Sequence, residues 1–225
     1  MLRRLLRTTA VTAVLATPLA ANAVFIGNVQ GGADFPQGAV SFADAFVSYA
    51  PGIVASGPTA PHQGASNAVG LPNYTGTNSC ASQAACTFVS LGDGGTITLQ
   101  FVDNRLTGSG TNALDLWIFE VGPDVEDMFV EISKDDVTYH AVGKVGGSTA
   151  GVDIDAFGWG IADQFAYVRL RDDPDLGGQS GATVGADIDA VGAISTVAVS
   201  VPEPGTLALL GLGLAGLAAT RRRKQ

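Results

Sequence analysis

The stretch FVSLGDGGTITLQF, residues 88–101, decides the fold class of this 225-residue chain. From residue 96 to residue 102, apolar side chains alternate with polar ones, which is the pattern of a half-buried strand. Residues 87–91 form a second short apolar run, and the glycine-rich segment 92–95 between the two runs favours a tight turn. The stretch therefore predicts a β-hairpin of two strands.

Further strand patterns follow along the chain. Residues 114–121, LDLWIFEV, form a nearly continuous apolar run, which favours a central strand covered on both faces. Residues 165–171 alternate, with the even-numbered positions predicted to face inward, whereas residues 42–49 fit either a strand or one face of a helix. The other predicted strands are residues 129–133, 138–142 and 188–199. With hardly any helix between them, these strands predict a single all-β domain, a β-sandwich.

Five of these segments, taken in order, resemble the galactose-binding, discoidin-type jelly roll of many secreted bacterial surface proteins. They are FVSLGDGGTITLQF, LDLWIFEVG, FVEIS, FAYVRLRD and GADIDAVGAI. The resemblance covers roughly residues 42–194, and we take residues 24–199 as one galactose-binding-like domain. It implies a jelly-roll-like sandwich whose loops at one end bind sugars or other surface ligands, in many cases with a structural Ca²⁺. Fold similarity alone does not prove a binding activity.

The first 23 residues predict a secretory signal peptide in the form of an N-terminal helix. A cationic start with three arginines precedes an apolar middle at residues 11–19 and a cleavage site of small residues at 21–23. The mature chain is therefore expected to begin at Val24.

Residues 200–225 differ in composition from the domain before them. Two prolines hold an extended segment at 202–204, and the fifteen uncharged residues 206–220 then predict a transmembrane helix. At about 1.5 Å per residue this helix spans roughly 22 Å, which is short for a bilayer core of about 30 Å. Basic residues follow, and the positive-inside bias places them in the cytoplasm and the domain outside.

This arrangement resembles the PEP-CTERM sorting signal of Gram-negative bacteria that make extracellular polysaccharide. The resemblance implies recognition by an exosortase-type membrane protease. It also implies anchoring in the inner membrane by the C-terminal helix before processing, and then release to the cell surface or extracellular matrix. The alternative is an ordinary single-pass anchor after a proline-rich linker. The residues expected to carry the signal are Pro202, Glu203, Pro204, Arg221, Arg222 and Arg223.

Charge excludes one class of partner. Between the two terminal segments the chain has twenty acidic and five basic residues, a formal charge of −15, whereas the whole chain carries −9. Such a surface repels nucleic acid and anionic lipid headgroups. We therefore expect no nucleic-acid partner.

Cys80 and Cys86 are the only cysteines of the chain. In an exported protein they are expected to form a disulfide. Because so short a loop contributes only about 2 kcal/mol on closure, the predicted bond is a local staple and not a condition of folding.

Aspartate is much more frequent than glutamate in the domain, and short carboxylates suit both turns and hard cations. We predict a structural calcium site from Asp44, Asp187 and Asp189, with Asp153 and Asp155 as a second choice. Asp-x-Asp spacing puts two carboxylates on one side of an extended segment. The alternative is that these residues are solvated turn residues.

Three side chains are predicted to contact a ligand. Trp159 is flanked by glycines that would let it reach a loop surface, although it could equally fold back and cap the core. Arg169 and Arg171 are expected on the outward face of their strand, where they could bind hydroxyls or acidic sugars. Pairing with neighbouring carboxylates is the ordinary alternative.

Motifs for catalysis are absent from the sequence. His62 and His140 are isolated, and no nucleophile-elbow, zinc-protease or phosphate-loop motif occurs. We therefore expect a non-catalytic exported protein of the cell surface or extracellular matrix, with extracellular polysaccharide as the candidate ligand. The alternative is a small secreted polysaccharide-active hydrolase that uses Glu120 and Glu126 as a carboxylate pair.

Overall fold

The computed structural model describes residues 23–54, 56–122, 126–147, 149–176, 180–199 and 211. In these residues almost all regular structure is β, with five short 3₁₀ turns between strands. The strands are β1 (Val24–Asn28), β2 (Gly31–Phe35), β3 (Ala45–Ala50), β4 (Gly52–Ile53), β5 (Val89–Ser90), β6 (Gly92–Asp93), β7 (Thr96–Gln100), β8 (Asn104–Leu106), β9 (Leu116–Glu120), β10 (Asp127–Ser133), β11 (Tyr139–Gly146), β12 (Ala150–Val152), β13 (Tyr167–Asp172), β14 (Asp187–Ala193) and β15 (Thr196–Ala198).

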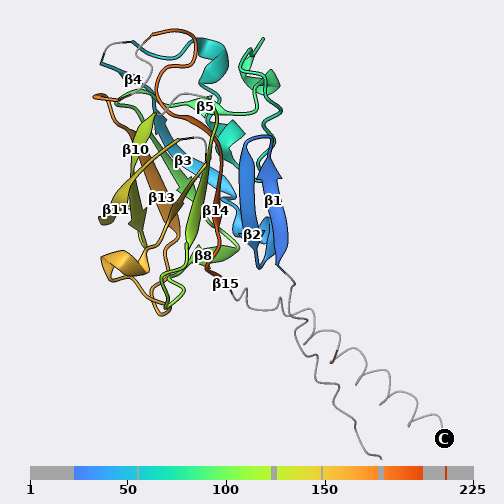
Figure 1. The fold of residues 1–225 in the computed structure, drawn as a ribbon, viewed down its shortest axis with the longest axis vertical. Coiled ribbons are helices and arrows are strands. Elements are labelled where there is room, and N and C mark those ends of the chain that lie inside the picture. Colours follow the sequence, from blue (N-terminus) through green and yellow to red (C-terminus); the bar gives the residue numbers. More distant parts are fainter. Residues whose placement is uncertain are drawn as a thin grey trace, which may run out of the picture.

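Two antiparallel sheets form the sandwich, and the remaining described strands pair in twos (Figure 1). One has the strand order β11-β10-β13-β7-β3 and the other the order β12-β9-β14-β5. They enclose one continuous core of fully buried aliphatic side chains, with Leu99 and Val168 from the first sheet and Ile118 and Val191 from the second. The prediction of an all-β, jelly-roll-like sandwich is confirmed.

The alternation predicted for residues 165–171 is also confirmed. Val168 and Leu170 are fully buried, whereas Arg169 is half-buried and Arg171 exposed. Because successive side chains of a strand point to opposite faces, β13 has one face in the core and one toward solvent.

Strand β9 is covered on both faces, as its continuous apolar run predicts. Its outer face contributes Phe119 to a second cluster with Phe35 and Phe42, whose ring centroids lie 6.3 and 6.0 Å from that of Phe119. The β1–β2 hairpin lies beside β14 and closes this cluster (Figure 1). Contact is close at Gly192 of β14, where an added Cβ would lie 2.6 Å from the Phe35 ring.

The predicted hairpin of residues 87–91 and 96–102 is wrong. Strand β5 pairs with β14 in the four-stranded sheet, whereas β7 lies between β13 and β3 in the five-stranded sheet. The glycine-rich segment between them crosses from one sheet to the other. Gly92 and Gly94 have φ values of 76° and 77°, which glycine adopts easily, so the segment can make a tight corner. The prediction failed because a glycine-rich segment is equally typical of a corner and of a hairpin turn.

Three strand boundaries also differ from expectation. The region 42–49, left open between strand and helix, contributes β3, and the strand predicted at 138–142 extends to residue 146. The single strand predicted at 188–199 is two strands, because the chain turns after β14 and β15 then pairs with β8.

The terminal predictions fall almost entirely outside the described residues. This applies to the signal peptide at 1–23 and to the helix at 206–220, apart from residues 23 and 211. Within the part of the chain that the structure describes, no helix has the length and apolar character needed to cross a membrane.

Candidate functional site

A polar groove lies on the outer face of the five-stranded sheet. Antiparallel register places Ser48 beside Thr98, Thr98 beside Arg169, and Arg169 beside Glu131, which makes one row across four strands. The neighbouring row contains Thr96 and Arg171. The groove has a volume of about 570 Å³. We call it the sheet-face groove, and its lining residues are Ser48, Thr96, Thr98, Glu131, Asp136, Tyr139, Arg169 and Arg171.

Arg169 is fixed at the centre of the sheet-face groove. Its Nε donates a hydrogen bond of 2.7 Å to Glu131 Oε2, and its guanidinium lies 3.7 Å from the centroid of the Tyr139 ring. The hydrogen bond to Glu131 raises the pKa of Arg169. Burial, and then hydrogen bonding to Asp136, raise the pKa of Tyr139 to about 12. Both groups therefore keep their protons at neutral pH, so the groove has fixed donors.

Arg171 has a more open setting at the rim of the sheet-face groove. Its guanidinium lies 4.3 Å from the centroid of the Phe129 ring, and it forms no ion pair with any residue that the structure describes. Lys144 lies beside Phe129 on the neighbouring strand β11, and its Nζ bridges Asp127 and Asp173 at 2.9 and 2.5 Å. Three of the five basic residues of the domain thus lie on this sheet face.

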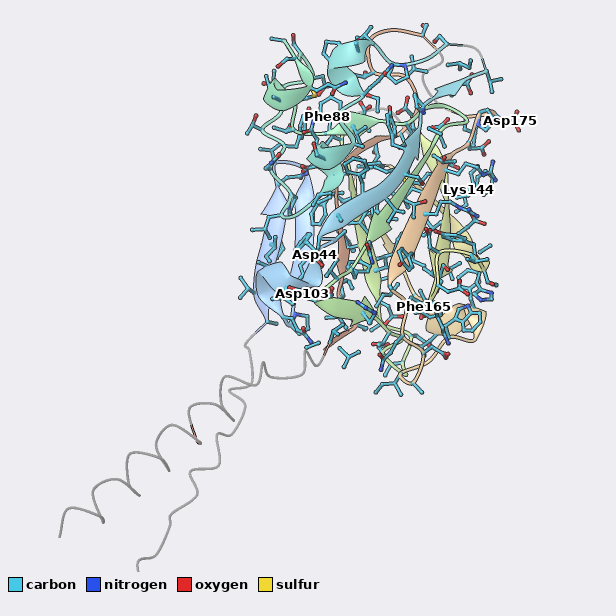
Figure 2. All side chains as sticks on the ribbon, turned by 180° about the vertical axis from the view of Figure 1, so that it is seen from behind. Asp44, Phe88, Asp103, Lys144, Phe165 and Asp175 are labelled. Carbon is cyan, nitrogen blue, oxygen red and sulfur yellow. A yellow bond between two sulfur atoms is a disulfide. The ribbon has the colours of Figure 1, made fainter. Side chains whose placement is uncertain are left out.

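Trp159 does not line the sheet-face groove. Its ring packs edge-on against that of Phe165, which Figure 2 labels, with ring centroids 5.3 Å apart. The ring centroid of His140 lies 4.5 Å from that of Trp159. Lys134 Nζ lies 5.7 Å from the centroid of the Trp159 ring. The tryptophan is half-buried against the core, which corresponds to the capping alternative stated for it.

The first choice of calcium ligands does not assemble. Asp44 Oδ2 accepts hydrogen bonds from the backbone amides of Val102 at 2.6 Å and Asp103 at 3.3 Å. Figure 2 labels Asp44 and Asp103. Asp189 instead accepts hydrogen bonds from Asn28 and from the amides of residues 73 and 74. Among the described residues Asp44, Asp187 and Asp189 form no group close enough to hold one ion. A register shift between residues 188 and 190 interrupts the alternation on which the prediction depended.

Asp187 belongs instead to a buried acidic region. It is 4% exposed, and its pKa lies well above the ordinary value because of burial first and then the charges of Glu126 and Asp172. Burial also raises the pKa of Asp172, although the amides of Gly94 and Ala186 donate to it at 2.9 and 2.8 Å. In the sequence, the pattern that indicates this region is Asp187 at the start of an otherwise largely apolar strand.

The second choice, Asp153 and Asp155, does come together with a third carboxylate. One oxygen of each lies within 4.8 Å of the others and of an oxygen of Asp115. The sequence reasoning missed Asp115, although it immediately precedes the apolar strand β9. We call these three residues the Asp115 cluster.

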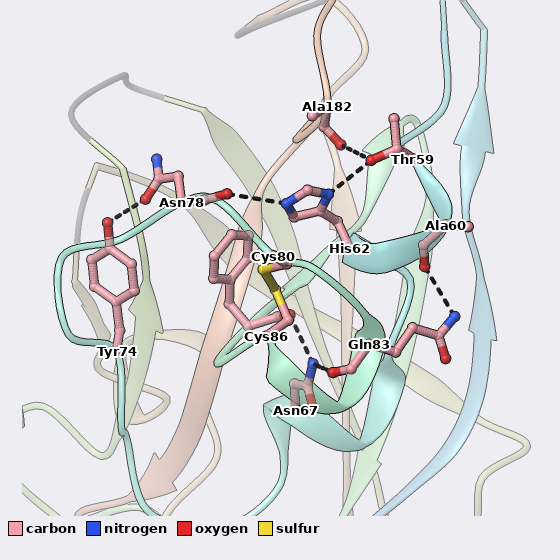
Figure 3. Close-up of a disulfide and its surroundings, with 11 residues drawn as sticks. Thr59, Ala60, His62, Asn67, Tyr74, Asn78, Cys80, Gln83, Cys86 and Ala182 are labelled. Atoms are coloured by element: carbon pink, nitrogen blue, oxygen red, sulfur yellow. Dashed lines mark hydrogen bonds between the residues drawn. A yellow bond between two sulfur atoms is a disulfide. The ribbon is translucent and has the colours of Figure 1, made fainter.

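The predicted disulfide between Cys80 and Cys86 is confirmed (Figure 3). Beside it, His62 is held by Thr59 Oγ1 at 2.9 Å and by the carbonyl of Asn78 at 3.1 Å. Although both sulfurs and His62 lie close together, the sulfurs are bonded to each other, so this group is structural.

Comparison with protein families concerns the C-terminal segment. Residues 200–224 match the PEP-CTERM protein-sorting motif. The predicted sorting signal is thereby confirmed, and the match spans both the Pro202–Pro204 and the Arg221–Arg223 segments. The motif indicates an exported protein that is processed by exosortase, a membrane enzyme, and sorted to the cell envelope or surface.

Similarity to solved structures is slight. The C-terminal domain of a chitobiase from Bacteroides fragilis shares 11% identity over 42% of this chain, with a TM-score of 0.28. The match spans 62% of the chitobiase domain. So low a TM-score supports no argument about function. None of the curated proteins compared with the sequence matches it.

Proposed function

We propose that the chain is a non-catalytic protein of the cell surface or extracellular matrix that binds extracellular polysaccharide through the sheet-face groove. The C-terminal helix would hold it in the inner membrane until exosortase releases it. The sorting motif supports delivery to the envelope of a Gram-negative bacterium. The observation that carries the binding proposal is the groove itself, since an exposed sheet face has arginines, carboxylates and hydroxyls in register.

The chemistry of the sheet-face groove fits a glycan. Thr96 and Ser48 offer hydroxyls, and Glu131 and Asp136 offer acceptors for sugar hydroxyls. Arg171 is available for a carboxylate or sulfate on an acidic sugar, because it forms no ion pair among the described residues. Since one face of Tyr139 is covered by Arg169, we expect hydrogen bonding and charge to dominate over ring stacking.

The hydrolase alternative has less support from the geometry. A glycosidase pair needs two carboxylates on either side of a sugar bond. Glu120 is 0% exposed and Glu126 is 6% exposed, so a polymer could not reach them without opening the sandwich.

Affinity electrophoresis in gels that contain the organism's own exopolysaccharide tests the proposal. Protein purified from cells that express the full chain should be retarded, without new reducing ends. Arg171→Gln should lose at least tenfold in affinity. Lys134→Gln, which makes the same charge change beside Trp159 and away from the groove, should bind like wild type. Retardation that is equal in all three proteins would exclude the groove, and new reducing ends would favour the hydrolase.

A further inference from the structure

The Asp115 cluster lies at one end of the four-stranded sheet, whereas the sheet-face groove is on the other sheet. Asp115 immediately precedes β9, and Asp153 and Asp155 follow β12, which is the antiparallel neighbour of β9. Like charges whose oxygens lie within 4.8 Å of one another repel, and burial strengthens the repulsion. The arrangement therefore calls for a positive charge.

One oxygen of the cluster is buried without a partner. Asp115 is 0% exposed, and its Oδ2 accepts the amide of Ile154 at 2.9 Å. Its Oδ1 is also buried and accepts no hydrogen bond from the residues that the structure describes. Leaving a buried carboxylate oxygen unsatisfied costs free energy, and this carboxylate is the one that meets Asp153 and Asp155.

No basic side chain of the domain compensates the cluster. Within the described residues, Lys134 pairs with Asp163, Lys144 with Asp127 and Asp173, and Arg169 with Glu131, while Arg105 donates to backbone carbonyls and Arg171 stacks on Phe129. A cation from solution is the remaining source of positive charge.

Backbone amides hold the other two carboxylates in place and leave oxygens available. Asp155 Oδ2 accepts the amides of Ser109 at 2.8 Å and Gly110 at 3.0 Å. Asp153 Oδ1 accepts the amide of Ala156 at 3.3 Å. In each case the second oxygen takes no hydrogen bond among the described residues, and both side chains are only half-buried, so water can reach the cluster.

We propose that Asp115, Asp153 and Asp155 bind a hard divalent cation, with Ca²⁺ as the best fit. All three ligands are oxygens, whereas Zn²⁺ sites use mainly nitrogen and sulfur. Ca²⁺ takes six to eight oxygens in flexible geometry, so that waters would complete the shell from the exposed side. Mg²⁺ requires a near-ideal octahedron and is usually bound through only one or two carboxylates, whereas this cluster has three. The bound ion would tie the start of β9 to the segment after β12.

Calorimetry and thermal unfolding with CaCl₂ test the proposal on protein purified from cells that express the full chain. After treatment with a chelator, the protein should release or absorb heat on titration with Ca²⁺. Its unfolding midpoint should rise in about 5 mM Ca²⁺, well above the roughly 10⁻⁴–10⁻³ M dissociation constants of extracellular calcium modules.

Two substitutions locate the ion. Asp153→Asn and Asp115→Asn should each weaken Ca²⁺ binding at least tenfold. If Asp115→Asn does not fold, Asp153→Asn still decides, because its side chain is half-buried and Asn can keep the hydrogen bond from Ala156. The matched control is Asp175→Asn, which makes the same charge change at an exposed turn (labelled in Figure 2).

The results distinguish Ca²⁺ bound at the Asp115 cluster from Ca²⁺ bound elsewhere and from no binding. A rise in midpoint that is lost in both cluster variants and kept in Asp175→Asn supports the site. The absence of heat and of any midpoint change in the wild type would overturn it. Undiminished Ca²⁺ binding in the variants would place the ion elsewhere, and a response to Mg²⁺ but not to Ca²⁺ would refute the calcium assignment.

Discussion

The two outer faces of the sandwich differ in whether another part of the chain covers them. Over the four-stranded sheet, Phe42 and Phe119 are buried together with Phe35 of the β1–β2 hairpin, with exposed fractions of 1, 0 and 0%. Over the five-stranded sheet, Arg169 is half-buried, Arg171 is exposed, and no equivalent hairpin covers them among the described residues. One outer face is therefore a second core, and the other remains available to a ligand.

The difference comes from the outward residues of each central strand. In β9 the outward residue Phe119 is aromatic, so leaving it in water would cost about 1.5–3 kcal/mol and a cover is favoured. In β13 the outward residues are Tyr167, Arg169 and Arg171, whose polar ends are well solvated. Stability is thus expected to depend on the first face and binding on the second.

The largest expected effect is a loss of stability on the covered face. Phe119→Ala should lower the free energy of unfolding by about 3–5 kcal/mol, because it removes a fully buried ring that packs against Phe35 and Phe42. Urea unfolding at pH 7 measures the change.

The matched substitution on the open face is Ser48→Ala. Since Ser48 is exposed on the edge strand β3, its loss should change the free energy of unfolding by about 0.5 kcal/mol or less. Similar losses for the two variants would mean that the outer faces do not differ in the way described.

A smaller effect is expected from pH at the buried acidic region. An aspartate with a raised native pKa holds its proton in the folded state while the unfolded chain releases it. Its contribution to stability is therefore present below the unfolded pKa, near 3.9, and is lost as pH rises through the native value. Asp187→Asn cannot ionise, so between pH 4.5 and pH 7.5 it should lose less stability than wild type, by about 1 kcal/mol.

Urea titrations of both proteins at the two pH values, with chelator present, measure this difference. Asp175→Asn serves as the control, because it makes the same substitution at an exposed turn. Parallel pH profiles for wild type and Asp187→Asn would show that the carboxylate ionises as freely in the folded protein as in the unfolded chain.

Local patterns predicted much of this fold, because they follow directly from burial. The continuous apolar run of β9 predicted a strand covered on both faces, and the alternation of β13 predicted a strand covered on one face. Pairing could not be predicted in the same way. The glycines between β5 and β7 permit a hairpin and a corner equally, and the choice depends on β14, a strand about ninety residues away.

The candidate sites show the same limit. Outward placement of Arg169 and Arg171 follows from alternation, but their partners Glu131 and Tyr139 come from β10 and β11, and only strand order brings them together. Asp153 and Asp155 were visible as a pair, yet Asp115 joins them through the pairing of β9 with β12. Conversely, Asp44 and Asp187 had the right chemistry but lie in different surroundings.

A comparably small effect on stability is expected at Arg171, and this variant sharpens the comparison most. Arg171→Gln removes an exposed guanidinium that stacks on Phe129, so the free energy of unfolding should fall by about 0.5 kcal/mol. Measured by urea unfolding beside the gel-retardation assay, this variant should keep its stability and lose polysaccharide binding. If its stability instead fell as far as that of Phe119→Ala, Arg171 would be a structural residue, and the open face would have to be regarded as a second protected surface. Retained stability together with lost binding is expected because the groove side chains are held by backbone register, which this substitution leaves intact.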